Sequence, residues 1–241
     1  MNVAIIPARG GSKRIPRKNI RLFNDRPLIA YSIAAALESG CFGRVVVTTE
    51  DPEVAEIARR EGAETPFVRP AELCDDYVGT MPILQHALRW LLAEGCAMEL
   101  ACCLYATAPM VHVDDLRRGR DLLLAAPGKA YAFSVTSFPF PIQRAVRLTA
   151  DGGVEPIQPE CIPKRSQDLE EAYHDAGQFY WGRTEAFLQG LSIFSRHSIP
   201  IILPRHRVQD IDTPEDWLRA EFLHRAIQLA EAEKNADRDS R

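Results

Sequence analysis

The chain has 241 residues, of which 46% are hydrophobic, and this length and content suit one sizeable domain, with room for a small subdomain. Its formal net charge of −4 favours neither a nucleic acid nor an anionic membrane surface as a partner. No apolar run reaches the ~20 residues of a membrane span, and no secretory leader precedes the first predicted strand. The six cysteines have neither C-x-x-C nor zinc-site spacing. We therefore expect a cytoplasmic protein.

The apolar run 3–6 is short enough to be a buried strand, and Pro7 ends it because proline cannot donate to a sheet ladder. A glycine-rich basic loop follows. Glycine lets backbone N–H groups approach an anion closely, and lysine and arginine add cationic donors, so the loop predicts a phosphate site. The simpler alternative is a solvated basic loop. The loop matches neither the G-x-x-x-x-G-K-S/T pattern nor G-x-G-x-x-G, which argues against a standard P-loop NTPase or dinucleotide enzyme.

Residues 8–19, ARGGSKRIPRKN, resemble the opening signature of the CMP-sialic acid synthetases, the cytidylyltransferases that activate nine-carbon acidic sugars. Further matches follow in order along nearly the whole chain. The resemblance implies that CTP binds the loop, with the nucleoside at Asn19 and with Arg9 and Lys13 taking part in catalysis. The implied nucleotide ligands in the loop are Arg9, Gly10, Gly11, Ser12, Lys13, Lys18 and Asn19.

The elements after the loop predict a doubly wound α/β fold. A helical pattern begins at Leu28 and can end at Gly40 in a left-handed conformation. The β-branched run 44–49 is typical of a parallel strand, and Asp51 caps a further helix that stops at Gly62. This order predicts a mostly parallel sheet whose ligands bind at the carboxyl ends of the strands, where the basic loop lies.

Residues 69–73, RPAEL, resemble the base-recognition segment of the same family. The resemblance implies that Arg69 and the hydroxyl of Thr80 contact cytosine. Thr80 could alternatively be only the N-cap of the next helix, which is marked by an apolar stripe from Ile83 to Leu92. The two roles are compatible, since a cap hydroxyl lies at an exposed helix start.

The predicted buried strand 100–105 ends at Tyr105, where the family has a glutamine that helps to hold the sugar. This departure indicates a related but different sugar. Alternatively, Tyr105 is a core residue that closes the strand.

Residues 137–162 break the alternation of strands and helices, after a helix that begins at Asp114 and a strand over 130–135. Four prolines and a Gly-Gly turn fall within this segment, which in an α/β domain predicts an inserted, projecting hairpin arm. The resembling family uses such an arm to embrace a second subunit and close the partner's sugar pocket, which implies a homodimer. From the residues alone, the segment could equally be a lid.

The segments RSQD (165–168) and EAYHDAGQFYWG (171–182) look like the branch of the family that activates pseudaminic acid, a bacterial sialic-acid-like sugar. Such aromatic and polar content suits a hydroxylated ligand. His174 and Asp175 could indicate acid–base chemistry, but neighbours on a strand point to opposite faces, which weakens a dyad. The expected sugar ligands are Tyr105, Arg165, Tyr173, His174, Gln178 and Tyr180.

Asp210 and Asp212 follow a predicted strand over 199–203 and share one face of an extended segment. Paired carboxylates suit Mg²⁺, and the resembling family has a D-x-D here, so we expect a catalytic metal site at this pair. A simpler alternative makes Asp212 or Thr213 the N-cap of the helix that Pro214 begins.

That last helix carries Leu218, Phe222 and Leu229 on one face, and the charged residues 233–241 are expected to be frayed.

Together with the resemblance, these features predict a single domain over 1–241 that transfers CMP from CTP to the anomeric hydroxyl of a nonulosonic acid, with pseudaminic acid as the favoured acceptor and pyrophosphate leaving. Such chemistry needs in-line positioning and charge neutralisation more than covalent help. The rival acceptors are N-acetylneuraminic, legionaminic and 3-deoxy-octulosonic acid. A rival of another class is a nucleotide-binding regulatory domain without turnover.

Overall fold

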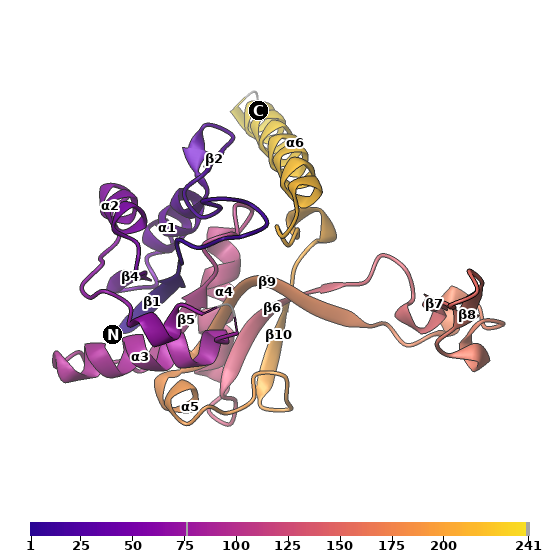
Figure 1. Cartoon of the computed structure of the whole chain (residues 1–241), viewed down its shortest axis with the longest axis horizontal. Coiled ribbons are helices and arrows are strands. Elements are labelled where there is room, and N and C mark those ends of the chain that lie inside the picture. The colour runs from indigo at the N-terminus through magenta and orange to yellow at the C-terminus, as the bar shows by residue number, and fades with distance from the viewer. Residues whose placement is uncertain (76, 240–241) are drawn as a thin grey trace.

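The computed structural model describes residues 1–75 and 77–239, with side chains through residue 233. Its centre is a six-stranded sheet in the order β10-β6-β9-β5-β1-β4 (Figure 1). β1 runs parallel to β4 and β5, and β10 runs parallel to β6. β9 is antiparallel to both of its neighbours, which makes the sheet mostly parallel, as predicted. The strands are β1 (Asn2–Pro7), β4 (Arg44–Thr48), β5 (Leu100–Leu104), β6 (Tyr131–Ser137), β9 (Tyr173–Arg183) and β10 (Ser198–Ile202).

The alternation of side chains along the strands divides the core into two layers. In β1, Ala4 and Ile6 belong to one buried cluster, whereas Val3 and Ile5 belong to another. The first cluster includes residues of α1 (Leu28–Ser39), α2 (Pro52–Arg60) and α4 (Val113–Ala125). The second includes residues of α3 (Thr80–Ala93) and α5 (Thr184–Leu188). Helices therefore cover both faces of the sheet, and the doubly wound prediction is confirmed.

Two predicted helix ends have the expected chemistry. Gly40 follows α1 with φ of 64°, a left-handed conformation that its missing Cβ makes easy. The carboxylate of Asp51 accepts the N–H groups of Glu53 and Val54 at the start of α2. α1 and α2 consequently begin and end where local sequence signals place them.

The insertion projects away from the sheet as an arm between the end of β6 and the start of β9 (Figure 1). It contains a two-stranded hairpin, β7 (Val146–Leu148) and β8 (Val154–Pro156), and short 3₁₀ turns. Its large apolar side chains Phe140, Leu148 and Val154 are exposed. The arm therefore builds no core of its own within one chain.

The last helix, α6 (Pro214–Asp239), packs through a different face from the one that the sequence indicates. Trp217 and Ala220 are buried with Phe23 of the hairpin formed by β2 (Leu22–Phe23) and β3 (Arg26–Pro27). The predicted apolar stripe lies on the outside: Leu218, Phe222 and Leu229 are exposed. Aromatic contacts decide the packed face, since Phe23 meets the rings of Trp217 and His224 edge to face.

The end of the chain is helical through Asp239, and of the predicted frayed tail 233–241 the last two residues lie outside the described part. No helix among the described residues is long and apolar enough to cross a membrane.

Candidate functional site

A cavity of about 560 Å³ lies at the carboxyl ends of β1 and β5. Four segments that are far apart in the sequence line it: the basic loop, the stretch around Arg69 and Thr80, residues 105–107 after β5, and the loop before α6. Of the predicted site residues, it gathers Arg9, Ser12, Lys13, Lys18, Asn19, Arg69, Thr80, Tyr105 and Asp212. The cavity is therefore strongly cationic on one wall and carries a carboxylate at its edge.

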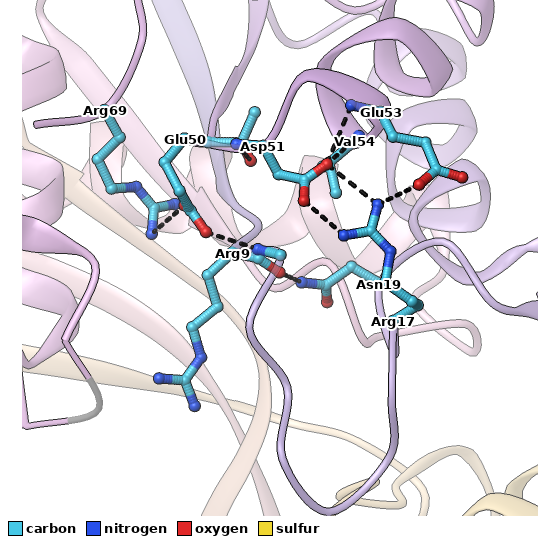
Figure 2. Close-up of polar contacts among 10 residues, drawn as sticks. Arg9, Arg17, Asn19, Glu50, Asp51, Glu53, Val54 and Arg69 are labelled. Carbon is cyan, nitrogen blue, oxygen red and sulfur yellow. Dashed lines mark hydrogen bonds and ion pairs between the residues drawn. The ribbon is translucent and has the colours of Figure 1, made fainter. Parts of the chain in front are cut away.

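An acidic segment directly after β4 holds both ends of the basic loop (Figure 2). Glu50 Oε1 accepts the Gly10 N–H at 2.7 Å. Farther along the loop, Arg17 forms ion pairs with Asp51 and Glu53. The hydrogen bond from Arg17 is the main cause that lowers the pKa of Asp51 from 3.8 to about 2, with the α2 backbone N–H groups adding to it. These contacts fix the path of the loop across the cavity mouth.

Sequence reasoning found Asp51 only as a helix cap and missed Glu50 and Glu53. The sequence held a signal for them. Three of the four residues 50–53 after β4 are acidic, and β4 lies next to β1, which leads into the basic loop. Opposite charges at the ends of neighbouring parallel strands are brought together by the sheet.

Gly10 and Asn19 set the shape of the loop. A Cβ on Gly10 would lie 2.2 Å from Asp51 Oδ2, so the close approach of that carboxylate requires glycine. At Gly11 a Cβ would meet nothing within 4 Å. The side-chain amide of Asn19, which is buried, donates to the Arg9 carbonyl at 2.8 Å. Asn19 thus braces the loop in addition to lining the cavity.

Lys18 and Arg14 tie the loop to Asp212. Lys18 Nζ donates to the Ile211 carbonyl at 2.6 Å and lies 3.4 Å from Asp212 Oδ1. Arg14 Nη2 lies 2.9 Å from Asp212 Oδ2. The predicted catalytic carboxylate and the predicted phosphate-binding loop therefore meet in one place.

The helix-cap alternative for Asp212 is resolved in favour of Thr213. Thr213 Oγ1 accepts the Asp216 N–H at 3.2 Å, and the Asp216 carboxylate accepts the Thr213 N–H at 2.9 Å, which is a capping box. Capping consequently does not explain why two aspartates precede the helix.

Asp210 and Asp212 are electrostatically linked. The pKa of Asp210 is raised, first by partial burial and then by the charge of Asp212, although part of the Asp210 side chain remains exposed. Among the described residues, no group of three or more His, Cys, Asp or Glu side chains forms a complete metal site. Two carboxylates alone fit a hard cation that takes its remaining oxygens from substrate and water.

Arg69 is buried beside the basic loop. Its guanidinium donates to Thr48 Oγ1 at 3.2 Å and to the Thr48 carbonyl. Burial lowers the pKa of Arg69, while the carboxylate of Glu50, 3.9 Å away, raises it. Thr80 is the first residue of α3, and Gly79 precedes it as an N-cap without a side-chain bond, so the Thr80 hydroxyl is not used for capping.

A chain of hydroxyl contacts connects the cavity wall to the base of the arm. Burial raises the pKa of Tyr105, and the neighbouring hydroxyls of Thr80 and Tyr180 partly offset that effect; the rings of Tyr105 and Tyr180 lie 5.4 Å apart. Tyr180 in turn donates to Asp175 Oδ2. Tyr105 also ends its strand, since its N–H donates to the Gln178 carbonyl at 2.9 Å. The two interpretations of Tyr105, as core residue and as cavity wall, therefore hold together.

The other predicted sugar ligands lie on the arm or at its base. Arg165 is exposed and pairs with Asp168 at 2.8 Å, and Tyr173 donates to Glu171 at 2.8 Å. His174 Nδ1 lies 2.8 Å from the Asp175 carbonyl, not its carboxylate. Gln178 is buried and donates to the Arg207 carbonyl at 2.5 Å. None of these four lines the cavity that the described residues of a single chain form.

Comparison with known proteins identifies the family of the chain. The family model described as cytidylyltransferase matches residues 3–235. The chain is 45% identical to the pseudaminic acid cytidylyltransferase of Campylobacter jejuni subsp. jejuni serotype O:2, over 93% of this chain and 96% of the relative. It is 30% identical to the CMP-N,N'-diacetyllegionaminic acid synthase of Legionella pneumophila subsp. pneumophila, over 92% of this chain and 95% of the relative.

Solved structures show the same fold at low sequence identity. A CMP:2-keto-3-deoxy-manno-octonic acid synthetase complexed with CTP has a TM-score of 0.68 and 17% identity, covering 95% of this chain and 99% of that one. The 4-diphosphocytidyl-2C-methyl-D-erythritol synthase of Anaerococcus prevotii has a TM-score of 0.59 and 12% identity, covering 94% and 98%.

Proposed function

This chain belongs to the cytidylyltransferase family and is a CTP-dependent nucleotidyltransferase, and we propose that it transfers CMP from CTP to pseudaminic acid. The observation that supports this most directly is the cavity in which the basic loop, Arg69 and Asp212 meet. The identity of 45% to a pseudaminic acid cytidylyltransferase, against 30% to a legionaminic acid enzyme, favours this acceptor over its nearest rival.

In the proposed reaction, the anomeric hydroxyl of the sugar attacks the α-phosphorus of CTP. A new P–O bond forms, the bond to the β-phosphate oxygen breaks, and the electron pair leaves with pyrophosphate while the hydroxyl proton passes to solvent. Arg9, Ser12, Lys13 and Lys18, together with the N–H groups around Gly10 and Gly11, would hold the triphosphate. These groups act by position and charge, which is most of what phosphoryl-type transfer requires of a protein.

Arg69 and Thr80 would contact the base, with Asn19 at the nucleoside. Arg69 lines the cavity while anchored on Thr48, so little of its mobility remains to be lost on binding. Thr80 lines the cavity, and its hydroxyl is not used to cap α3 because the N-cap is Gly79.

Asp210 and Asp212 would hold Mg²⁺. The two carboxylates lie two residues apart in the segment before α6, and the charge of Asp212, after burial, raises the pKa of Asp210, which supports a shared hard cation. When bound, such an ion supplies neutralisation of phosphate charge and lowers the pKa of a coordinated hydroxyl. Arg14 and Lys18 also pair with Asp212, so protein cations would share with the ion in balancing the charge of this carboxylate.

Tyr105 would form the wall of the cavity that contacts the sugar, and Tyr180 would hold Tyr105 in place. Pseudaminic acid carries a methyl and a second acylamino group where neuraminic acid carries hydroxyls, so a tyrosine wall leaves fewer hydroxyls unmatched. The hydrogen bond from Tyr180 to Asp175, together with the contact between the rings of Tyr180 and Tyr105, would help to hold this wall in place.

The arm would pair with a second copy of the chain and bring Arg165, Tyr173 and His174 to the partner's cavity. Its exposed Phe140, Leu148 and Val154 support this, because a patch that cannot cover itself favours an interface. Replacing Leu148, which is 82% exposed, by Lys should give a monomer in light scattering at micromolar concentration. A Leu148→Lys dimer with full activity would contradict an arm-mediated dimer.

The reaction is proposed to take place in the cytoplasm. All six cysteines are free in the structure, and five of them are buried, as expected for reduced thiols that pack as small apolar groups.

A panel assay tests the acceptor. Pyrophosphate release would be measured with CTP, Mg²⁺ and each of four acids: pseudaminic, N-acetylneuraminic, legionaminic and 3-deoxy-octulosonic. We expect kcat/KM for pseudaminic acid to exceed the others by ~100-fold or more, as is reasonable where buried polar groups go unmatched. Equal or reversed preference would remove the assignment of the sugar and leave that of the reaction.

A further inference from the structure

Glu50 lies half-buried between the phosphate loop and Arg69, where sequence reasoning assigned it nothing (Figure 2). Its Oε1 is satisfied by the Gly10 N–H. Its Oε2 is buried, accepts no hydrogen bond from the described residues, and lies 3.9 Å from Arg69 Nη1. A buried carboxylate oxygen without a hydrogen bond is costly, so a contact with a compensating charge is the feature that accounts for its place.

The Glu50 carboxylate supplies the negative charge nearest to the buried guanidinium of Arg69. The hydrogen-bond acceptors of Arg69 are the two oxygens of Thr48, which carry no charge. Its side chain is 2% exposed. Burial and the nearby guanidinium of Arg9 both lower the pKa of Arg69, and the largest opposing influence is the charge of Glu50. Without Glu50, a buried cation would remain beside a like charge, an arrangement that favours movement of the guanidinium toward solvent.

We infer that Glu50 is a positioning residue that holds the Arg69 guanidinium in the nucleotide cavity and thereby sets the affinity for the base of CTP. This inference rests on the proposed contact between Arg69 and cytosine. Glu50 does not itself line the cavity, so it acts through Arg69 and touches no substrate. Because the same carboxylate accepts the Gly10 N–H, it also links the base-binding arginine to the phosphate loop.

The test is a double-mutant cycle with Glu50→Gln and Arg69→Met, followed by steady-state kinetics at saturating sugar. Glutamine keeps an oxygen for the Gly10 N–H and loses the charge. We expect Glu50→Gln to raise KM for CTP by about tenfold or more, with kcat changed by less than about threefold. Adding Glu50→Gln to Arg69→Met should change KM by less than about threefold further, because the two substitutions remove one interaction.

Two further variants separate positioning from folding. Glu64 forms a bidentate pair with Arg44 on β4, away from the cavity, so Glu64→Gln removes a carboxylate–arginine pair without touching the site and should leave KM unchanged. Glu50→Asp keeps the charge and should retain most of the affinity for CTP even if Glu50→Gln folds poorly.

Three results would overturn the inference. The first is an unchanged KM for CTP in Glu50→Gln. The second is a rise in KM in the double variant equal to the product of the rises in the two single variants. The third is a rise in KM in Glu50→Asp as large as that in Glu50→Gln. An unchanged KM in Arg69→Met would remove the base assignment itself, and the inference with it, while leaving the cytidylyltransferase reaction untouched.

Discussion

Replacing Gly10 by Ala should destabilise the protein through Asp51, a residue 41 positions later in the chain. The added methyl would lie 2.2 Å from Asp51 Oδ2 and 2.8 Å from its Cγ, so the carboxylate must move. That carboxylate caps α2 and pairs with Arg17. Loss of an N-cap costs about 0.5–2 kcal/mol. The pair with the half-exposed Arg17 adds about 0.2–1 kcal/mol. The expected loss is therefore about 1–3 kcal/mol.

Gly11→Ala is the matched control, because a Cβ there meets nothing within 4 Å. Neither glycine has a positive φ, so alanine at either position brings the same small entropic gain through the unfolded chain. Urea unfolding followed by circular dichroism would measure the difference in unfolding free energy between the two variants. Equal stability of the two variants would refute the claim that Asp51 is what requires glycine at position 10.

The remaining predictions concern charge, specificity and pH. Asp212→Asn should reduce turnover by roughly a hundredfold or more, because it removes one of the two proposed ligands of the ion that would neutralise the reacting phosphate, and should leave the unfolding midpoint within error. Retained activity and Mg²⁺ dependence in both this variant and Asp210→Asn would end the metal assignment. Tyr105→Phe should raise KM for the sugar more than KM for CTP, because it removes a hydroxyl from the wall proposed to contact the sugar and leaves the residues proposed to hold CTP in place. The same shift in both constants would contradict that role of Tyr105. The pKa of Asp51 is lowered on folding, so its contribution to stability is present above its unfolded pKa and is lost as the pH falls from about 4 toward 2. Asp51→Asn should therefore be less stable than the wild type at pH 7. If the difference in unfolding free energy between the two proteins were the same at pH 2, the Arg17 pair would not be its source.

The local sequence already determined most of the framework. Apolar runs such as 3–6 form strands because backbone groups in a buried segment must pair in a sheet. Asp51 and Gly40 mark helix ends because capping acts over three or four residues. The phosphate loop could also be predicted from the sequence, because glycines and cations that are adjacent in the sequence stay adjacent in any fold.

Contacts between distant segments needed the tertiary structure. The packed face of α6 depends on Phe23, some 200 residues earlier, so periodicity alone selected the exposed stripe of Leu218, Phe222 and Leu229. Likewise, nothing local to Glu50 shows that it lies between Gly10 and Arg69, because the parallel pairing of β1 with β4 brings these three together. The sequence by itself determined which segments form strands, helices and a basic loop, because those preferences act over a few residues. Only the tertiary structure decided which charges face one another, because that depends on strand order, which no short stretch of sequence encodes.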